Sequence, residues 1–175
     1  LKALQPKCKI VEIKKLTKGA ACTTLLAKKY INTKAPLIIA NSDQFIEWNS
    51  AKTLYNFTTK NVDGGILVFK SFHPKWSYAL TDKYNMVTEV AEKKVISNNA
   101  TVGVYYWKKG SDYVKFAERM IKNKIMVNNE FYVCPVYNQA IKDNKKIMID
   151  TINKMWGLGT PEDLNYFVQN YKLKN

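Results

Sequence analysis

A carboxylate follows one of the most apolar short runs of the sequence. Residues 36–40 are continuously apolar, and Asp43 lies three residues beyond them. A short apolar run is typical of a strand buried on both faces of a sheet, and open α/β sheets bind ligands beyond the carboxyl ends of their strands. A carboxylate at that place can hold a divalent cation that bridges phosphate oxygens. Asp43 is therefore a candidate Mg²⁺ ligand, with a turn or helix cap as the alternative.

Glu92 and Lys93 are a second candidate, directly after an alternating segment over residues 86–90. A carboxylate accepts hydrogen bonds from hydroxyls, and an ammonium neutralises a phosphate. A solvated hairpin end is the alternative. Adjacent residues of an extended strand point to opposite faces. Both side chains can reach one ligand only if the strand ends at Glu92 and Lys93 lies on the following turn.

Two further candidates have weaker support: a turn of small residues and a glutamate among aromatic residues. Lys18, Gly19 and Ala20 form a turn into a helical stretch, where exposed N–H groups can meet a nucleotide; tight packing explains the glycine equally well. Glu130 lies among aromatic residues and suits a sugar hydroxyl, with a half-buried rim position as the alternative.

The few histidines and cysteines argue against histidine-dependent catalysis and against a zinc site. His73 is the one histidine and precedes Pro74 in a predicted turn, so nucleophilic catalysis that needs a histidine has little support. The three cysteines, Cys8, Cys22 and Cys134, show no CxxC spacing. A structural zinc site is thus disfavoured, and a reducing cytoplasm with cysteines as small core residues is expected.

The elements that must position these residues can be read from periodicity. Strands are expected over residues 8–13, 37–40, 65–69, 77–80, 86–90, 101–107 and 147–152. Helices are expected over residues 18–31, 50–60, 112–122 and 136–142, with a last helix that begins after Thr160 as N-cap. The first strand, helix and buried strand would make a βαβ unit. We expect one α/β domain over residues 1–175 with a mixed sheet, in which Leu37, Ile38 and Ile39 lie on a central strand.

The charge raises the question of nucleic acid. The 175 residues carry 28 basic and 14 acidic side chains, a net charge of +14. All the basic residues except Arg119 are lysines, and they are scattered along the chain. Base-reading arginine forks are therefore almost absent, which favours a solvated surface or a phosphate-bearing substrate over nucleic acid. No apolar run is long enough to span a membrane, and no signal segment opens the chain.

Six segments, taken in order, are similar to one enzyme family: residues 16–23, 36–44, 90–94, 100–106, 129–132 and 156–164. The chain resembles the sugar-phosphate nucleotidylyltransferases, also called nucleotide-sugar pyrophosphorylases, and most of all their capsule and surface-polysaccharide branch. The resemblance implies a Rossmann-like three-layer α/β/α sandwich with a mixed, mainly parallel sheet. It implies an enzyme that joins a nucleoside triphosphate to a sugar phosphate with Mg²⁺ and releases pyrophosphate.

The resemblance also implies roles for the residues at matching positions. Those roles are Mg²⁺ binding for Asp43, catalysis for Asp43 and Lys93, nucleotide binding for Lys18, Gly19 and Ala20, and substrate binding for Glu92, Lys93, Gly103 and Glu130.

The chain departs from the family at three places. The N-terminal GxGxR loop is missing, and the chain opens on Leu1, so we expect the C-terminal two thirds of a longer domain. Gly157 stands where many members have a second metal-binding Asp, and Ala79 replaces a Gly near the sugar. Three alternatives stay open: a cytidylyltransferase for a non-sugar phosphate, a phosphosugar-binding module, and a basic nucleic-acid-binding domain. A homo-oligomer is a further expectation.

Overall fold

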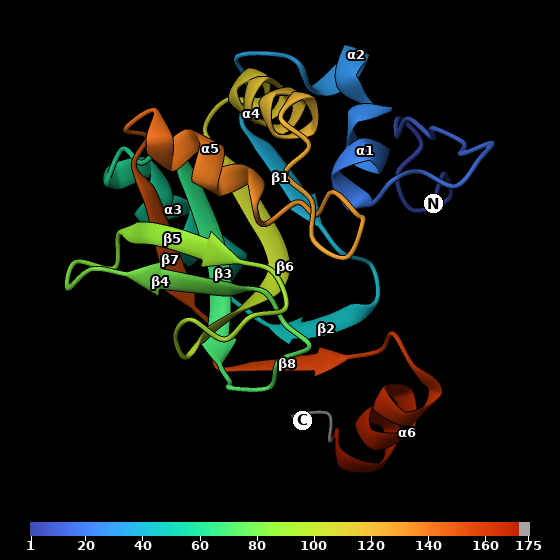
Figure 1. Cartoon of the computed structure of the whole chain (residues 1–175). Helices are drawn as coiled ribbons and strands as arrows, with labels where there is room; N and C mark the ends of the chain where they lie inside the picture. Colours follow the sequence, from blue (N-terminus) through green and yellow to red (C-terminus); the bar gives the residue numbers. More distant parts are fainter. Residues whose placement is uncertain (172–175) are drawn as a thin grey trace.

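A six-stranded sheet lies between helices in the computed structural model, which describes residues 1–171 (Figure 1). Its strands are β1 (Leu37–Ala40), β3 (Gly64–Lys70), β4 (Tyr78–Thr81), β5 (Val87–Ala91), β6 (Asn99–Trp107) and β7 (Ile147–Thr151). The helices are α1 (Ala20–Leu25), α2 (Lys28–Ile31), α3 (Ser50–Thr59), α4 (Gly110–Lys122), α5 (Val136–Lys142) and α6 (Pro161–Asn170). The strands and helices expected between residues 50 and 152 are therefore confirmed, apart from shifts of a few residues at their ends.

Strand β6 organises the sheet because β1, β3 and β4 all pair with it, each antiparallel. Strand β3 pairs with β7 in parallel, and β5 pairs with β4 antiparallel. The mixed sheet is confirmed. Strands β1, β3, β4 and β7 run in one direction, but β6 runs against them in their midst. Neighbouring strands are therefore mostly antiparallel, and only β3–β7 is a parallel pair among the described residues.

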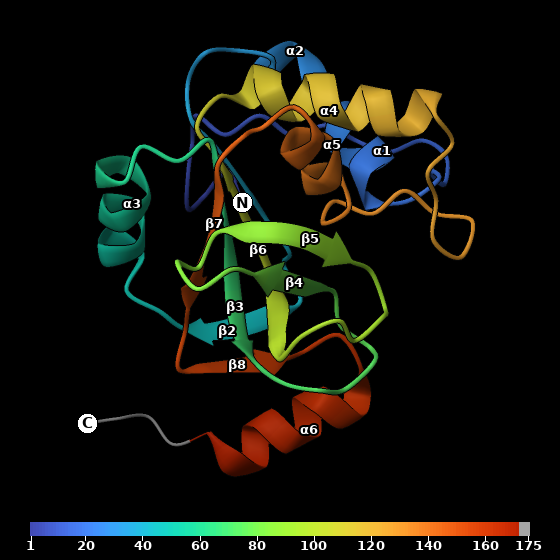
Figure 2. The same cartoon turned by 60° about the vertical axis from the view of Figure 1, so that its left-hand side comes forward.

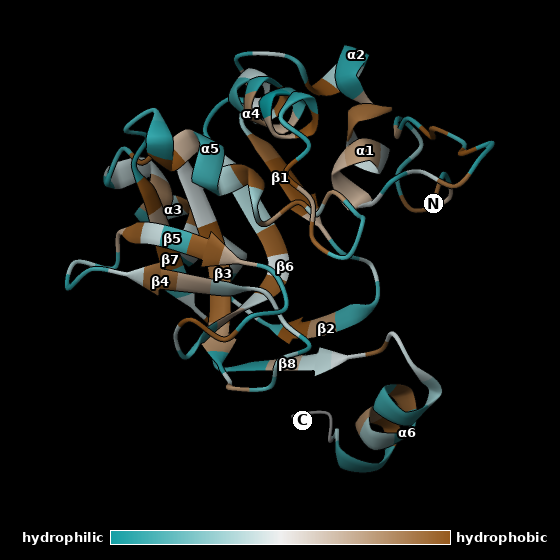
Figure 3. Ribbon diagram, in the orientation of Figure 1, coloured by the Kyte–Doolittle hydropathy of each residue, from teal (hydrophilic) through white to brown (hydrophobic). Residues whose placement is uncertain are grey.

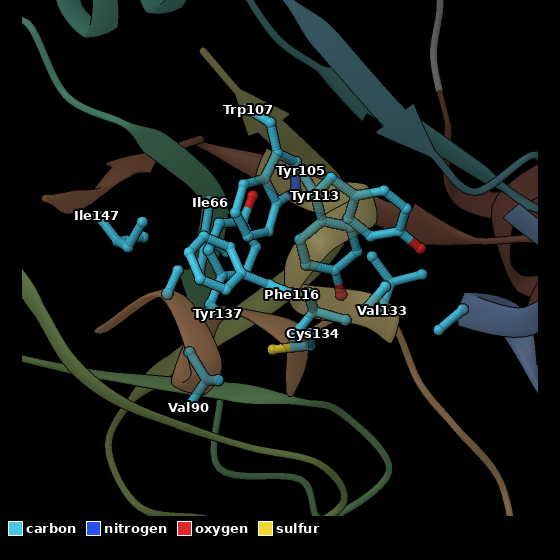
Figure 4. Packing of buried hydrophobic residues seen from close by; sticks show 14 of the residues in the cluster. Ile66, Val90, Tyr105, Trp107, Tyr113, Phe116, Val133, Cys134, Tyr137 and Ile147 are labelled. Atoms are coloured by element: carbon cyan, nitrogen blue, oxygen red, sulfur yellow. The ribbon is translucent and has the colours of Figure 1, made fainter. Parts of the chain in front are cut away.

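The two faces of the sheet bury different side chains, which produces the expected three layers (Figure 2). Alternate residues of β6 divide between the faces: Tyr106 packs on Phe57 of α3, and Trp107 packs on the α4–α5 side. The Trp107 ring stacks on Tyr137 at 4.3 Å between centroids (Figure 4). The Tyr137 hydroxyl, although buried, donates to backbone carbonyls of Gly65 or Tyr106 at 3.0 and 2.9 Å. Burial of this hydroxyl is thereby compensated.

A small second layer lies beyond the main sheet (Figure 1). Strands β2 (Gln44–Glu47) and β8 (Lys154–Gly157), neither of which the periodicity predicts, form an antiparallel pair. Helix α6 covers this pair through an aromatic cluster of Phe45, Trp156, Phe167 and Tyr171. The helix begins as expected, because the Thr160 side chain accepts a hydrogen bond from the Asp163 amide at 3.1 Å.

Two expectations for the N-terminal part are wrong. Residues 8–13 form no strand, so the βαβ unit is not formed, and the segment lies largely exposed. Strand β1 is not central: within residues 1–171 it pairs with β6 alone, and Ile38 is 43% exposed. Leu37 and Ile39 pack on the core, while Ile38 points to the other face and stays exposed. Three consecutive apolar residues therefore alternate in burial.

Hydropathy follows this architecture (Figure 3). The central strands are mostly apolar, and polar residues lie on the outer faces of α4 and α5 and in the turns. Within residues 1–171, no helix has the length and apolar character needed to cross a bilayer.

Candidate functional site

One cavity gathers residues from segments far apart in the sequence. It has a volume of about 310 Å³ and lies between α1, residues 41–44, the ends of β4 and β5, the middle of β6, and the loop before α5. Four of the residues singled out from the sequence line it: Ala20, Glu92, Lys93 and Gly103. This cavity is the candidate functional site.

Glu92 follows the last residue of β5 and enters the cavity from its rim. The Ser77 hydroxyl, placed just before β4, donates a hydrogen bond to Glu92 Oε2 at 2.5 Å. Burial raises the pKa of Glu92, and the Ser77 hydrogen bond and the Lys93 charge only partly oppose that shift. The carboxylate keeps oxygen lone pairs available to accept from hydroxyl groups of a ligand.

Lys93 follows in the left-handed region, with φ 51°, and its amide donates to the Trp76 carbonyl at 3.1 Å. This turn places Lys93 on the same cavity as Glu92. The ammonium donates to the Tyr132 hydroxyl at 2.8 Å and lies 4.9 Å from the centre of that ring. The hydrogen bond to Tyr132 is the main reason that the pKa of Lys93 is raised. The site therefore holds a firmly protonated cation beside a partly desolvated carboxyl.

Glu130 does not line the cavity but is connected to it. The Tyr132 hydroxyl donates to Glu130 Oε2, which raises the pKa of that tyrosine, so Glu130, Tyr132 and Lys93 form one chain of contacts. Glu130 and Tyr132 are two residues apart, and this spacing places both side chains on one side of an extended segment.

Gly103 marks a bend in the floor of the cavity. Its φ is 72°, a value that favours glycine, and a Cβ atom there would lie 2.5 Å from Asn41 Nδ2. Strand β6 changes partner at this place, from β4 at Ala100 to β1 at Val104. The glycine keeps the floor of the cavity free of a side chain at the bend.

Lys18 and Gly19 pack against the loop before α5. The Lys18 carbonyl accepts from the Phe131 amide at 2.8 Å, and the Ala21 amide donates to the Phe131 carbonyl at 2.9 Å. Gly19 has φ 109°, and a Cβ atom there would lie 2.6 Å from the Phe131 oxygen. Close packing thus accounts for this glycine, whereas Ala20 next to it lines the cavity.

Asp43 lies beside the cavity and outside its lining. Its carbonyl accepts from the Leu158 amide at 2.8 Å, and a Cβ atom at Gly159 would lie 2.9 Å from its Oδ2. The side chain is exposed. Residues 1–171 contain no group of three or more His, Cys, Asp or Glu side chains that could hold a metal ion. Asp43 therefore offers a single carboxylate, a donor set that Mg²⁺ accepts when phosphate oxygens and water complete it.

Sequence reasoning missed several residues of the cavity. Gln44 lines it with a buried Nε2 that has no hydrogen-bond partner among the described residues. Ser77, Tyr132 and Cys134 also line it. Burial raises the pKa of the Cys134 thiol well above its usual range, so this cysteine stays neutral. Two of them had a signal in the sequence: Tyr132 follows Glu130 by two residues, and Gln44 belongs to the polar stretch directly after residues 36–40.

Comparison with known proteins shows the fold. No family profile and no curated protein matches the sequence. A nucleoside-diphosphate-sugar pyrophosphorylase from Vibrio cholerae superposes with TM-score 0.76 and 21% identity, over 90% of this chain and 68% of that one. A Bacillus anthracis protein described as a glucose-1-phosphate thymidylyltransferase, in complex with a sucrose, gives TM-score 0.72 and 13% identity, over 94% and 66%.

A UDP-glucose pyrophosphorylase complexed with UDP-glucose gives TM-score 0.72 and 14% identity, over 90% of this chain and 65% of that one. The chain thus spans about two thirds of the length of these solved structures. The chain has the Rossmann-like α/β fold of the sugar nucleotidyltransferases that it resembles in structure.

Proposed function

We propose that this chain is the nucleotide-sugar-binding part of a sugar-phosphate nucleotidylyltransferase. The observation that carries the proposal is the placement of Glu92 and Lys93, which line one cavity from two consecutive positions. A sugar phosphate needs such a pair, an acceptor for hydroxyls and a cation for the phosphate. The fold likeness to a pyrophosphorylase complexed with UDP-glucose supports the same assignment.

The proposed reaction is a displacement at phosphorus. An oxygen of the sugar phosphate attacks the α-phosphorus of a nucleoside triphosphate, the new O–P bond forms, and the bond to the β-phosphate oxygen breaks to release pyrophosphate. No covalent bond to the protein is needed, so the chain contributes positioning and charge stabilisation. Lys93 offsets negative charge on the sugar phosphate, and Glu92 orients the sugar by accepting from its hydroxyls.

Asp43 is the proposed Mg²⁺ ligand. One exposed carboxylate fits a cation that takes most of its ligands from phosphate and water. When bound, the cation supplies neutralisation of phosphate charge. Lys18, Gly19 and Ala20 are the proposed edge of the nucleotide site, and Ala20 lies in the cavity.

We further propose that residues 1–175 form one domain and that the protein acts in the cytoplasm, where it makes precursors of capsule or other surface polysaccharide. Gly103 and Glu130 complete the proposed substrate site, Gly103 as the bare floor of the cavity and Glu130 through Tyr132.

Isothermal titration calorimetry tests the proposal. The chain is titrated with UDP-, dTDP-, CDP- and GDP-glucose, and with glucose and a DNA duplex as controls. We expect saturable binding of at least one nucleotide sugar and its weakening in Glu92→Gln. Failure of all four nucleotide sugars would contradict the proposal. DNA binding with a steep dependence on salt, in place of nucleotide-sugar binding, would favour the basic nucleic-acid-binding domain instead.

A further inference from the structure

A second cavity, which shares no lining residue with the candidate site, lies on the α3 face of the sheet. Its volume is about 720 Å³, within the usual range of about 300–1,000 Å³ for ligand sites. It is formed where the turn between β4 and β5 meets the start of β7 and the segment after α3. In Figure 1 that turn lies at the left of the molecule, whereas α1 and β2 of the candidate site lie toward the right.

The walls of this cavity are apolar and adaptable. Val62 is 2% exposed and Met148 4% exposed, and both belong to the core cluster on the α3 face. Met86 and Met148 face each other across an isolated antiparallel β-bridge, so their side chains lie on the same face of the sheet. Tyr84, 68% exposed, adds an aromatic ring. Methionine side chains fit irregular apolar ligands because they are unbranched and polarisable.

The rim is cationic. Lys60 and Lys146 both line the cavity, and within residues 1–171 no ion pair or side-chain hydrogen bond engages either ammonium group. Two carboxylates close in sequence to residues of this lining, Asp82 and Asp63, have other partners. Asp82 accepts from the Tyr84 and Met86 amides at 2.8 and 2.9 Å, and Asp63 accepts from the Lys146 amide at 3.0 Å and pairs with Lys145. No carboxylate lines the cavity itself.

We propose that this cavity is a second binding site, for a phosphate monoester that carries a short apolar chain or ring. The phosphate lies between Lys60 and Lys146, which bind it as point charges. The apolar part packs on Met86 and Tyr84, from which it displaces water, above the buried Val62 and Met148. The proposal does not depend on the function proposed for the first cavity.

Methyl NMR tests this site directly. In protein labelled with ¹³C at the methionine methyls, signals are assigned with Met86→Leu and Met148→Leu, and hexyl phosphate is the probe. We expect the methyl signals of Met86 and Met148 to shift saturably with hexyl phosphate. The signal of Met120, which is buried in the other core cluster, should not shift. Inorganic phosphate has only the charged group of the probe, and hexanol has only its apolar chain. Each should bind at least about tenfold more weakly than hexyl phosphate. An unchanged Met120 signal also reports that each variant is folded.

Paired lysine variants supply the matched control. The double variant Lys60→Gln/Lys146→Gln should bind hexyl phosphate at least about tenfold more weakly, because two charge-assisted contacts are lost. Lys122→Gln/Lys142→Gln removes the same charge from exposed positions on α4 and α5 and should change the affinity less than about twofold. No saturation by about 10 mM probe, or equal losses in the two double variants, would overturn the proposal.

Binding to vesicles distinguishes a site for a free phosphate ester from a site for a lipid headgroup. Vesicles of phosphatidylcholine with phosphatidic acid should capture both lysine double variants equally. Capture that depends on Lys60 and Lys146, together with no response to hexyl phosphate, would contradict a site for a free ester.

Discussion

Glu92 and Lys93 are consecutive residues, yet both line the same cavity, because the chain turns at Lys93, with φ 51°, two residues beyond the end of β5. In a continued strand their side chains would have pointed to opposite faces. Ser77 holds the carboxylate, and Tyr132 holds the ammonium. A local backbone turn thus brings a hydrogen-bond acceptor and a cation to one cavity.

The burial of Glu92 should destabilise the protein at neutral pH. Its pKa is raised in the folded state by desolvation. Its contribution to stability is therefore present below the ordinary pKa of a glutamate and is lost as pH rises through the folded-state value. Glu92→Gln does not titrate, so the free energy of unfolding of the variant, relative to wild type, should increase between about pH 4 and about pH 7.5.

Urea unfolding at both pH values measures this difference. Glu89→Gln, on the exposed side of the same strand, is the control and should show little change with pH relative to wild type. A Glu92→Gln difference that is constant, or that falls as pH rises, would show that Glu92 is not desolvated.

Gly19 should tolerate no side chain. Alanine there combines a φ of 109° with a Cβ atom 2.6 Å from the Phe131 oxygen. We expect a loss of at least about 2 kcal/mol in the free energy of unfolding, from backbone strain and displacement of the Phe131 loop. Gly157→Ala is the matched control, since its Cβ atom would meet Asp163 at an ordinary 3.4 Å; it should cost less than about 1 kcal/mol. Equal losses would exclude the close contact at Gly19.

Ile38 should contribute little to stability. It is 43% exposed on an edge strand, whereas Ile66 on β3 is fully buried. We expect Ile38→Ala to cost less than about 1 kcal/mol and Ile66→Ala about 2–5 kcal/mol, because only the second leaves a cavity in the core. Thermal and urea unfolding compare the two. If Ile38→Ala also lowered the free energy of unfolding by about 2–5 kcal/mol, this face of β1 would have to be covered.

The elements from residue 50 onward were predictable because their periodicity agrees with their burial. Helix α4 places Phe116, Ala117 and Met120 on one buried face, as its 3.6-residue pattern indicates. Ile38 was not predictable, since an apolar run does not say which strands will flank it. Residues 8–13 alternate like a strand, but alternation without a pairing partner does not make one.

The shared position of Glu92 and Lys93 on one cavity could be predicted, because the sequence indicated that the strand ends there and that a turn follows. Gly103, which also lines the cavity, was singled out only by the family resemblance. The place of Ser77 was not predictable, because it depends on long-range pairing: the Ser77 carbonyl accepts a hydrogen bond from the Thr101 amide of β6. Such contacts have no local signal in the sequence.

The central claim is that Lys93 binds the phosphate of a sugar phosphate. Calorimetry of glucose 1-phosphate against wild type, Lys93→Met and Lys94→Met tests it most directly, because Lys94 is an exposed neighbour outside the cavity. A charge-assisted contact contributes about 1.5–3 kcal/mol, so Lys93→Met should raise the Kd by about ten- to a hundredfold. Lys94→Met should change it less than about twofold. Equal affinities in the two variants, or no binding to wild type, would contradict the account.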